Sequence, residues 1–575
     1  WQSFNVGANS VVNFNQPNAS SSTLNRIVGG NPSQIYGQIN ATGEVLLVNG
    51  QGIYFSPNSQ IEVGSIAATT HDISNDDYLN GHYQFREGMD SGSIVNQGRI
   101  KALNDYVALL APEVRNEGLI FAQRGTVALA SGETILLKFN DTRTLSSITA
   151  TPSLIKGLID NRYLIEAPGG QVIMTATAVN ILNGGIIKQS GKVNVTQAVQ
   201  QSLTKTADGK IMLSSNQIMF DSQSETIAQS SQGNSRISAT ASEQIDVRAG
   251  AIITTNATAT GQNAGNIQLA AGKQLNLAGT LSANASNSGV GGQVKTSAPT
   301  VSVASSAQIS AASNVLGHAG SWNLEASKVS INPILADVMG ASLNHTNVNA
   351  SANQTLCGPN CDDVGAILLE SNSSIHKMSL IPTSLSLRSD QNLTFNGSLR
   401  DDQGTLTASF TSFGDLSVST LASLTSGQVS FVAAEDITIY GQVNSMGSNT
   451  QNSMVNILGA NVAIYGLISG RNPLNGGKIN LTAIKNMMLG HNSRVRGHGS
   501  VISISGQTVN SHSSIIQTNN GNGRGGTILI NASNDADLYN TSLNASGLAG
   551  GSVLIASSHG DVNLSESQIQ TNGSS

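Results

Sequence analysis

Acidic side chains occur in short groups along the chain, and paired carboxylates are what a polysaccharide hydrolase or lyase needs for acid–base catalysis. The groups are Asp72 with Asp76 and Asp77, Asp362 with Asp363, Asp401 with Asp402, and Asp535 with Asp537. Each group lies in a polar stretch, where Asp is favoured simply because it caps and forms turns. None recurs in register from one repeat to the next. We therefore predict solvated turns and no enzymatic activity, and a carbohydrate-active β-helix enzyme is the alternative.

The two cysteines, Cys357 and Cys361, flank Gly-Pro-Asn in a chain that has no other thiol. This turn sequence favours a disulfide that closes a short loop in an oxidising compartment. A zinc site would need two more ligands, for which only His345 and His376 are near. We predict the Cys357–Cys361 disulfide and no metal. The loop that it stiffens is either a ligand contact or an inert insertion.

Composition excludes several classes of function. The 575 residues include 60 Gly and 11 Pro, with 39% hydrophobic, 11% charged and 4% aromatic residues and a net charge of −6. Hydrophobic residues are too frequent for a disordered chain, and the Gly, Asn, Ser and Thr content favours β-structure with many turns. No Lys/Arg-rich run is present, so nucleic acid is not expected as a partner. No phosphate-binding loop or dinucleotide motif is convincing, and we predict no cofactor.

Short strands with alternating apolar residues recur through the chain, often after a Gly pair, as in Gly476-Gly-Lys-Ile-Asn-Leu and Gly525-Gly-Thr-Ile-Leu-Ile. In the C-terminal part, the first inward position recurs with a period of roughly 25 residues, within the range of solenoid repeats. These positions are Val429, Val455, Ile479, Ile502, Ile528 and Val553. One repeat contains three short strands separated by polar corners, which fits one coil of a parallel β-helix.

The predicted fold class is therefore all-β, a right-handed parallel β-helix. One coil cannot bury its apolar face alone, whereas stacked coils share one interior and pair their backbone groups with the coils above and below. Asn or Ser ladders suit the corners. A β-sandwich array or a propeller is the alternative, but propeller blades need roughly 40 to 50 residues and recurrent aromatic signatures. Extra elements are expected where the period fails, at 142–161 and 333–382.

The N-terminal sequence resembles the secretion domain of the filamentous haemagglutinin family, whose members are the exoproteins of two-partner secretion. The resemblance rests on Leu24-Asn-Arg-Ile, on Gly43-Glu-Val-Leu-Leu-Val-Asn-Gly-Gln-Gly-Ile-Tyr-Phe and on Ile61-Glu-Val-Gly. It implies a domain that caps the β-helix and carries the signal read by an outer-membrane transporter. The matching signal positions are Asn25, Arg26, Asn49, Gly50, Gln51 and Gly52.

The second of these motifs departs from the family pattern, because Asn49-Gly-Gln-Gly replaces the usual Asn-Pro-Asn-Gly. Asn at the first position and Gly at the last are retained, so we expect a tight turn between strands. A structural turn without a recognition role is the alternative for these residues. The chain is closer to the high-molecular-weight adhesin and haem-acquisition branches than to the haemagglutinin and haemolysin branch.

The expected domains are a two-partner secretion domain over 1–140, β-helix repeats over 141–332, an irregular insertion with the cysteine pair over 333–382, and repeats of roughly 25 residues over 383–575. The resemblance implies a filamentous adhesin, a monomeric rod that is secreted or held on the surface of a Gram-negative bacterium after passage through the periplasm. Its expected partners are the transporter and a host-cell, bacterial or matrix ligand, including glycans. The alternatives are the stalk of a contact-dependent toxin or haemolysin and a haem-carrier-binding exoprotein.

Overall fold

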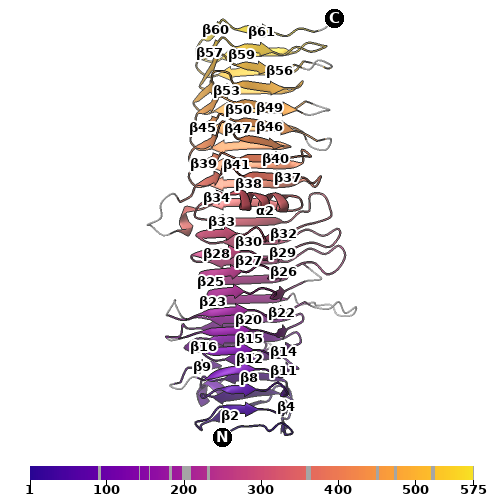
Figure 1. Cartoon of the computed structure of the whole chain (residues 1–575), viewed down its shortest axis with the longest axis vertical. Helices are drawn as coiled ribbons and strands as arrows, with labels where there is room; N and C mark the ends of the chain where they lie inside the picture. The colour runs from indigo at the N-terminus through magenta and orange to yellow at the C-terminus, as the bar shows by residue number, and fades with distance from the viewer. Residues whose placement is uncertain are drawn as a thin grey trace. The chain divides into compact units, whose positions relative to one another are not determined.

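The computed structural model describes residues 1–88, 92–141, 143–154, 156–179, 184–196, 209–229, 233–357, 364–448, 452–471, 476–519, 523 and 525–573. They form two compact units, Trp1–Gly320 and Ser321–Ser575. Within each unit short strands lie one above another, and strands of successive coils pair in parallel (Figure 1).

The first unit has three faces of stacked parallel strands. One face consists of β1 (Val11–Phe14), β4 (Gln38–Ala41), β7 (Gln60–Val63), β11 (Arg99–Ala102), β14 (Leu119–Ala122), β19 (Leu164–Glu166), β22 (Lys192–Asn194), β24 (Glu225–Ile227), β26 (Ile252–Thr254), β29 (Thr280–Ser282) and β32 (Gln308–Ser310). The second consists of β2 (Ser22–Ile27), β5 (Glu44–Asn49), β8 (Ser65–Thr69), β12 (Tyr106–Leu110), β15 (Thr126–Ser131), β20 (Gln171–Ala176), β27 (Asn266–Ala271) and β30 (Gln293–Ser297). The third consists of β3 (Ser33–Ile35), β6 (Ile53–Phe55), β10 (Ser93–Asn96), β13 (Glu113–Asn116), β18 (Leu158–Asn161), β21 (Ile186–Gln189), β28 (Gln274–Leu277) and β31 (Thr300–Val303). The long strands β23 (Lys210–Phe220) and β25 (Arg236–Val247) run through both of these faces and join them into one sheet.

An antiparallel sheet and a short helix are added to the first unit. The sheet has the order β17 (Leu145–Ala150), β16 (Thr134–Phe139), β9 (Gln84–Arg86), and the helix is α1 (Asn75–Leu79). Phe85 of β9 and Ile135 of β16 are fully buried in the core that these elements share with the coils. The sequence predicts an extra element within 142–161, and β17 is that element. The other strand in this stretch, β18, belongs to a coil.

The second unit has three faces of parallel strands. The first consists of β33 (Ser321–Ala326), β35 (Asn347–Ala352), β38 (Thr383–Ser389), β41 (Leu406–Ser412), β44 (Gln428–Ala433), β47 (Met454–Gly459), β50 (Lys478–Ala483), β53 (Val501–Gly506), β56 (Thr527–Ala532) and β59 (Ser552–Ser557). The second consists of β34 (Val329–Ile331), β36 (Ile367–Leu369), β39 (Leu393–Phe395), β42 (Leu416–Val418), β45 (Ile437–Ile439), β48 (Val462–Ile464), β51 (Asn486–Leu489), β54 (Thr508–His512), β57 (Ala536–Tyr539) and β60 (Val562–Ser565). The third consists of β37 (Ser374–Lys377), β40 (Ser398–Asp401), β43 (Ser423–Ser426), β46 (Gln442–Met446), β49 (Leu467–Arg471), β52 (Arg494–Gly497), β55 (Ile515–Gln517), β58 (Ser542–Asn544) and β61 (Gln568–Gln570).

The register of the second unit confirms the repeat that the sequence predicts. The expected inward positions are direct Cα partners on successive strands, from Val429 with Val455 through to Ile528 with Val553. Buried and less buried residues alternate along these strands, as in β41, where Leu406, Ala408, Phe410 and Ser412 are buried and the residues between them are partly exposed. Period-two alternation therefore sends one apolar column inward while polar side chains face out. The parallel β-helix prediction is confirmed.

Side-chain amides form a buried ladder in the first unit, as expected for a stacked fold. Asn96 Nδ2 donates to Asn116 Oδ1, Asn116 Nδ2 to Asn161 Oδ1, and Asn161 Nδ2 to Gln189 Oε1, each over 2.8 Å. All four side chains are at most 1% exposed. Burial of an amide is tolerated because the next coil supplies the missing hydrogen-bond partner.

The stretch 333–382 combines an added element with regular coil strands. Helix α2 (Pro333–Leu343) begins after Asn332, whose side chain caps Leu335 N over 2.9 Å, and the short η1 helix covers Gln354–Leu356. Strands β35, β36 and β37 nevertheless pair in parallel with neighbouring coils. In this stretch the irregularity is therefore confined to segments between strands that keep the coil register. In the part of the chain that is described, no helix is long and apolar enough to cross a bilayer.

Candidate functional site

The residues Asn49 to Gly52 form the tight turn that the sequence predicts between β5 and β6. Gly52 N donates to Asn49 O over 3.1 Å, and Asn49 Oδ1 accepts the backbone N–H of Gln51 over 3.0 Å. Gly52 has φ +120°, and a Cβ there would lie 2.9 Å from Ser93 O. Only glycine suits this position, both for its backbone conformation and for the closeness of the next coil.

The side chain of Asn49 also joins the turn to the preceding loop. Its Nδ2 donates to Asn31 O over 3.1 Å and to Ser33 Oγ over 3.0 Å, and the residue is 1% exposed. Gly50 O accepts the N–H of Gly92 over 2.8 Å, so the next coil is held against the turn as well. The motif therefore has a structural role, and its recognition by a transporter stays a prediction.

Asn25 and Arg26 lie together on β2, but their side chains have different partners. Asn25 is 2% exposed, and its Oδ1 accepts the indole N–H of Trp1 over 3.0 Å. Arg26 Nε lies 2.8 Å from Asp72 Oδ1, and its guanidinium also donates to Asn75 Oδ1 over 3.1 Å. Asn25 thus fixes the first residues to the coil, and Arg26 fixes the segment that leads into α1. Strands β2 and β5 pair in parallel, with Ile27 opposite Asn49, so the structure places Asn25 and Arg26 on the strand next to the one that leads into the Asn49 turn.

The cysteine and histidine candidates fall into separate environments. Cys357 follows η1 and is disulfide-bonded, whereas Cys361 lies outside the described residues, so the Cys357–Cys361 pairing stays a prediction. His376 lies on β37 with its Nε2 2.9 Å from Asp402 Oδ2. Burial lowers the pKa of His345, and the nearby Lys377 lowers it further. Within the described ranges no three His, Cys, Asp or Glu side chains come together as a metal site.

The described acidic candidates are held by turns and neighbouring coils. Asp401 accepts the N–H of Leu406 over 2.8 Å, and Asp535 accepts that of Asp561 over 3.0 Å. Hydrogen bonds from His376 and then from Arg400 lower the pKa of Asp402. Asp77 N is capped by Ser74 Oγ over 2.9 Å, and Asp72 pairs with Arg26 as above. Asp362 and Asp363 lie outside the described residues.

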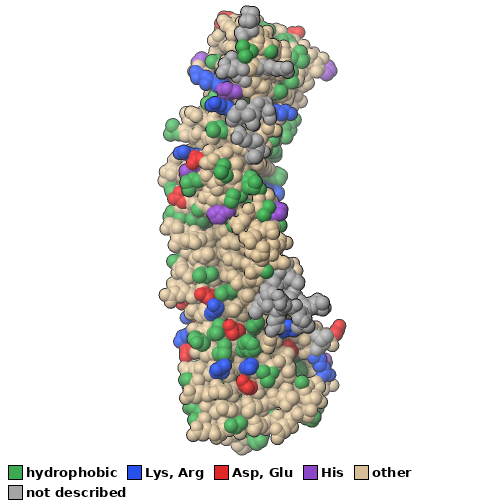
Figure 2. Space-filling view, turned by 90° about the vertical axis from the view of Figure 1, so that its right-hand side faces the viewer, with side chains coloured by type: hydrophobic (Ala, Val, Ile, Leu, Met, Phe, Trp, Pro, Cys, Tyr) green, Lys and Arg blue, Asp and Glu red, His purple; other side chains and the backbone are tan. Residues whose placement is uncertain are grey.

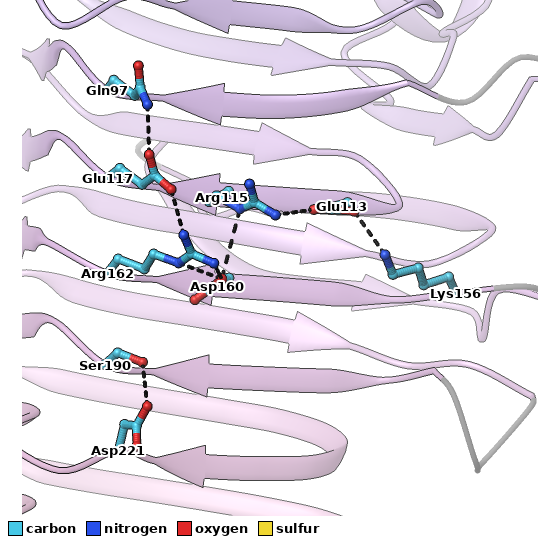
Figure 3. Close-up of polar contacts among 9 residues, drawn as sticks. All are labelled: Gln97, Glu113, Arg115, Glu117, Lys156, Asp160, Arg162, Ser190 and Asp221. Atoms are coloured by element: carbon cyan, nitrogen blue, oxygen red, sulfur yellow. Dashed lines mark hydrogen bonds and ion pairs between the residues drawn. The ribbon is translucent and has the colours of Figure 1, made fainter.

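An ion-pair network on the first unit was missed by the sequence reasoning. Glu113 and Arg115 of β13, and Glu117 just after it, meet Lys156, Asp160 and Arg162 from the next coil (Figure 3). Arg162 bonds Asp160 and Glu117 over 2.8 Å each, and Glu113 lies 2.9 Å from both Arg115 and Lys156. The hydrogen bond to Asp160 raises the pKa of Arg162.

The signal for this network lies in the pairing register. Arg115 and Asp160 are direct Cα partners on β13 and β18, and Arg115 Nε is 3.9 Å from Asp160 Oδ2. They are far apart in sequence, because the β16–β17 hairpin intervenes, and the period alone could not align them. Gln97 Nε2 extends the contacts by donating to Glu117 over 2.7 Å. Partly exposed pairs such as Glu113 with Lys156 contribute about 1 kcal/mol or less each. The Asp160 side chain is only 5% exposed, so its pair with Arg162 is not of this kind. We assign the network to the joining of coils.

Known proteins resemble the chain chiefly at its N-terminal part. Residues 1–237 match the family model described as the TPS secretion domain. Two curated proteins named heme/hemopexin-binding protein, both from Haemophilus influenzae, are 32% and 35% identical over 238 and 98 residues. These matches cover 39% and 17% of this chain but only 25% and 11% of the relatives' own lengths. The solved HMW1 secretion domain from Haemophilus influenzae is 19% identical, with a TM-score of 0.43 over 71% of this chain and 89% of that one.

The class of protein follows from the fold and the family match together. A parallel β-helix whose first 237 residues match a TPS secretion domain defines an exoprotein of two-partner secretion. The resemblance read from the N-terminal motifs is confirmed by the TPS secretion domain over residues 1–237. The matched range extends beyond residue 140, at which the secretion domain was expected to end.

Proposed function

We propose that this chain is exported across the outer membrane by a two-partner secretion transporter and then acts, secreted or on the cell surface, as an adhesin. The TPS secretion domain over residues 1–237 is the observation that carries the proposal, because that domain implies an outer-membrane transporter as its partner. Asn49 and Gly52, at the family's signal motif, form an ordered turn that such a partner could read.

The outward faces of the coils support a binding role that needs no enzymatic pocket. Strands alternate inward apolar and outward polar residues, and the face in Figure 2 is mostly uncharged polar side chains and backbone with scattered charges. In the second unit, the half-exposed rings of Tyr440 and Tyr465 stack at 5.0 Å on neighbouring coils. Polar surfaces with exposed aromatic rings suit glycan or protein ligands on host cells, bacteria or matrix.

Export is tested by expressing the chain with an outer-membrane transporter of this system and measuring its amount in the medium and on cells. We expect Asn49→Ala to reduce export, whereas Asn40→Ala, which changes an exposed amide on β4, should not. Thermal unfolding of each purified variant separates recognition from folding. Unchanged export of Asn49→Ala with unchanged stability would leave this residue a turn former only.

Attachment is tested with cells that display the exported chain, using host cells and immobilised glycans as targets. Adherence above that of cells lacking the chain supports the adhesin role. The double variant with Tyr440→Ser and Tyr465→Ser lacks the stacked rings and is compared with the wild-type chain. Both positions are on the surface.

A second candidate function is the binding of a haem carrier. The observation in its favour is the name of the two Haemophilus influenzae relatives, heme/hemopexin-binding protein. The exported chain, fixed to a sensor surface, would then retain haem-loaded hemopexin. Cells that display the chain would adhere to host cells no better than cells that lack it. Retention without adherence would replace the adhesin proposal with this one.

A further inference from the structure

A pocket of about 830 Å³ lies in the first unit, beside α1 and the antiparallel sheet. Its walls combine acidic and aromatic side chains: Glu44, Tyr78, Tyr83, Asp105, Tyr106 and Phe139. All lie within the residues matched to the TPS secretion domain. Neither the export motifs nor the ion-pair network contributes a side chain to this pocket.

Glu44 is a half-buried carboxylate whose partners are neutral. The hydroxyl of Tyr83 donates to Glu44 Oε2 over 2.6 Å, and the hydroxyl of the fully buried Tyr106 donates to Oε1. Burial, and then the charge of Glu44, raises the pKa of both tyrosines, so both phenols stay protonated as donors. Among the described residues no cationic side chain lies within 4 Å of Glu44. Its negative charge is therefore oriented but not neutralised.

Asp105 adds a second carboxylate to the same wall. Its Oδ2 accepts the N–H of Leu145 over 3.2 Å, whereas its Oδ1 is buried without a hydrogen-bond partner. A buried acceptor left unpaired is costly, and an ion bound beside it would offset that cost. Burial raises the pKa of Asp105 to about 6, so it is largely ionised at neutral pH.

Four aromatic side chains line the pocket together with these acids. The ring centroid of Phe139 lies 5.1 Å from that of Tyr83 and 5.6 Å from that of Tyr106. Tyr78 packs edge-on against Tyr83 at 6.4 Å. Ring faces attract organic cations, and carboxylates attract any cation, so the two together select a cation with an apolar stem. Arg143 also lines the pocket but is exposed and forms no ion pair with either acid.

We propose that this pocket binds a lysine or arginine side chain of the outer-membrane transporter that exports the chain. The identity of the partner rests on the proposed function, whereas the cation preference rests on the pocket alone. The stem would pack on Phe139 and the tyrosines, and the ammonium or guanidinium group would reach Glu44 and Asp105.

The cation site is tested on the purified full chain with n-butylammonium and n-butylguanidinium, detected by saturation-transfer NMR, and with n-butanol as the neutral counterpart. We expect the cations to bind at least about tenfold more tightly than butanol, as charge-assisted contacts predict. Glu44→Gln and Asp105→Asn should each remove most of that preference. Glu62→Gln, an exposed acid of β7 3.9 Å from Lys101, should keep it.

Cation binding no tighter than that of butanol, or unchanged by both pocket variants, would overturn the proposal. Circular dichroism of each variant verifies folding, and Asp105→Asn decides the matter if Glu44→Gln does not fold. Export with the transporter forms the second arm. A Glu44→Gln chain that folds, loses cation binding and is still exported at the wild-type rate would overturn the transporter as the source. A wild-type chain that is not exported would contradict the proposed function, while the NMR result still decides the cation site.

Discussion

Both units are stacks of parallel coils, but their interiors differ. The first carries a buried amide ladder from Asn96 to Gln189, with an antiparallel sheet packed beside its coils. The second stacks apolar rings, with Phe410 5.7 Å from Phe395 and 5.0 Å from Phe431. Coil stacking thus accepts polar or apolar columns, provided that each side chain finds its partner one coil away. The antiparallel sheet and α1, and with them the pocket, belong to the unit that contains the secretion domain.

The largest expected effect is the loss of the aromatic column of the second unit. Phe410→Ala removes a fully buried ring between two others and should destabilise the unit by about 3–5 kcal/mol. Hydrogen exchange measures this locally, as faster exchange in β41 and the strands next to it. The matched control is Phe413→Ala, a half-exposed ring at which we expect a much smaller change. Equal effects of the two variants would show that the column does not stabilise this unit.

Breaking the polar column of the first unit should have the next largest effect. Asn116→Leu leaves the Asn96 amide and the Asn161 carbonyl unpaired, which costs about 1–3 kcal/mol for each group. Asn40→Ala interrupts an exposed amide contact and should be nearly neutral. Protection from hydrogen exchange in β10, β13 and β18 reports the difference. An Asn116→Leu chain as stable as wild type would mean that the ladder is replaceable by apolar packing.

The pH dependence of the first unit should reflect Asp105. Burial raises its folded pKa to about 6, above the value of the unfolded chain. The folded state therefore holds the proton more tightly, and this group lowers stability as pH rises from about 4 to 7. Asp105→Asn should raise the melting temperature at pH 8 and have little effect at pH 4. An identical shift at both pH values would contradict the assigned ionisation.

The smallest effect is expected for the surface ion pairs of the first unit. Arg248→Met removes the ion pair with Asp221, whose two side chains are 49% and 35% exposed, and should cost about 1 kcal/mol or less. The loss should shrink between about 0.1 M and 1 M salt, because salt screens exposed charges. Urea unfolding at both salt concentrations measures it. A large loss that salt does not change would indicate packing of the arginine stem instead.

Local sequence signals were sufficient for the coils and for the Asn49 turn. Ile479, Ile502 and Ile528 lie in register as their spacing predicts, and Gly52 takes the positive φ expected of it. Both are short-range patterns, set by period-two alternation and by turn chemistry. The pairing of Arg115 with Asp160 was not predictable, since the hairpin between them breaks the period.

By itself the sequence determined the parallel β-helix and the resemblance to a two-partner secretion domain, because apolar alternation, Gly corners and the N-terminal motifs are all local features of the chain. Only the tertiary structure decided which distant side chains meet. Glu44 is joined to Tyr106 across coils, and Asp105 faces the pocket beside the β16–β17 hairpin. Their proximity depends on stacking register and on the placement of added elements, which sequence spacing does not encode.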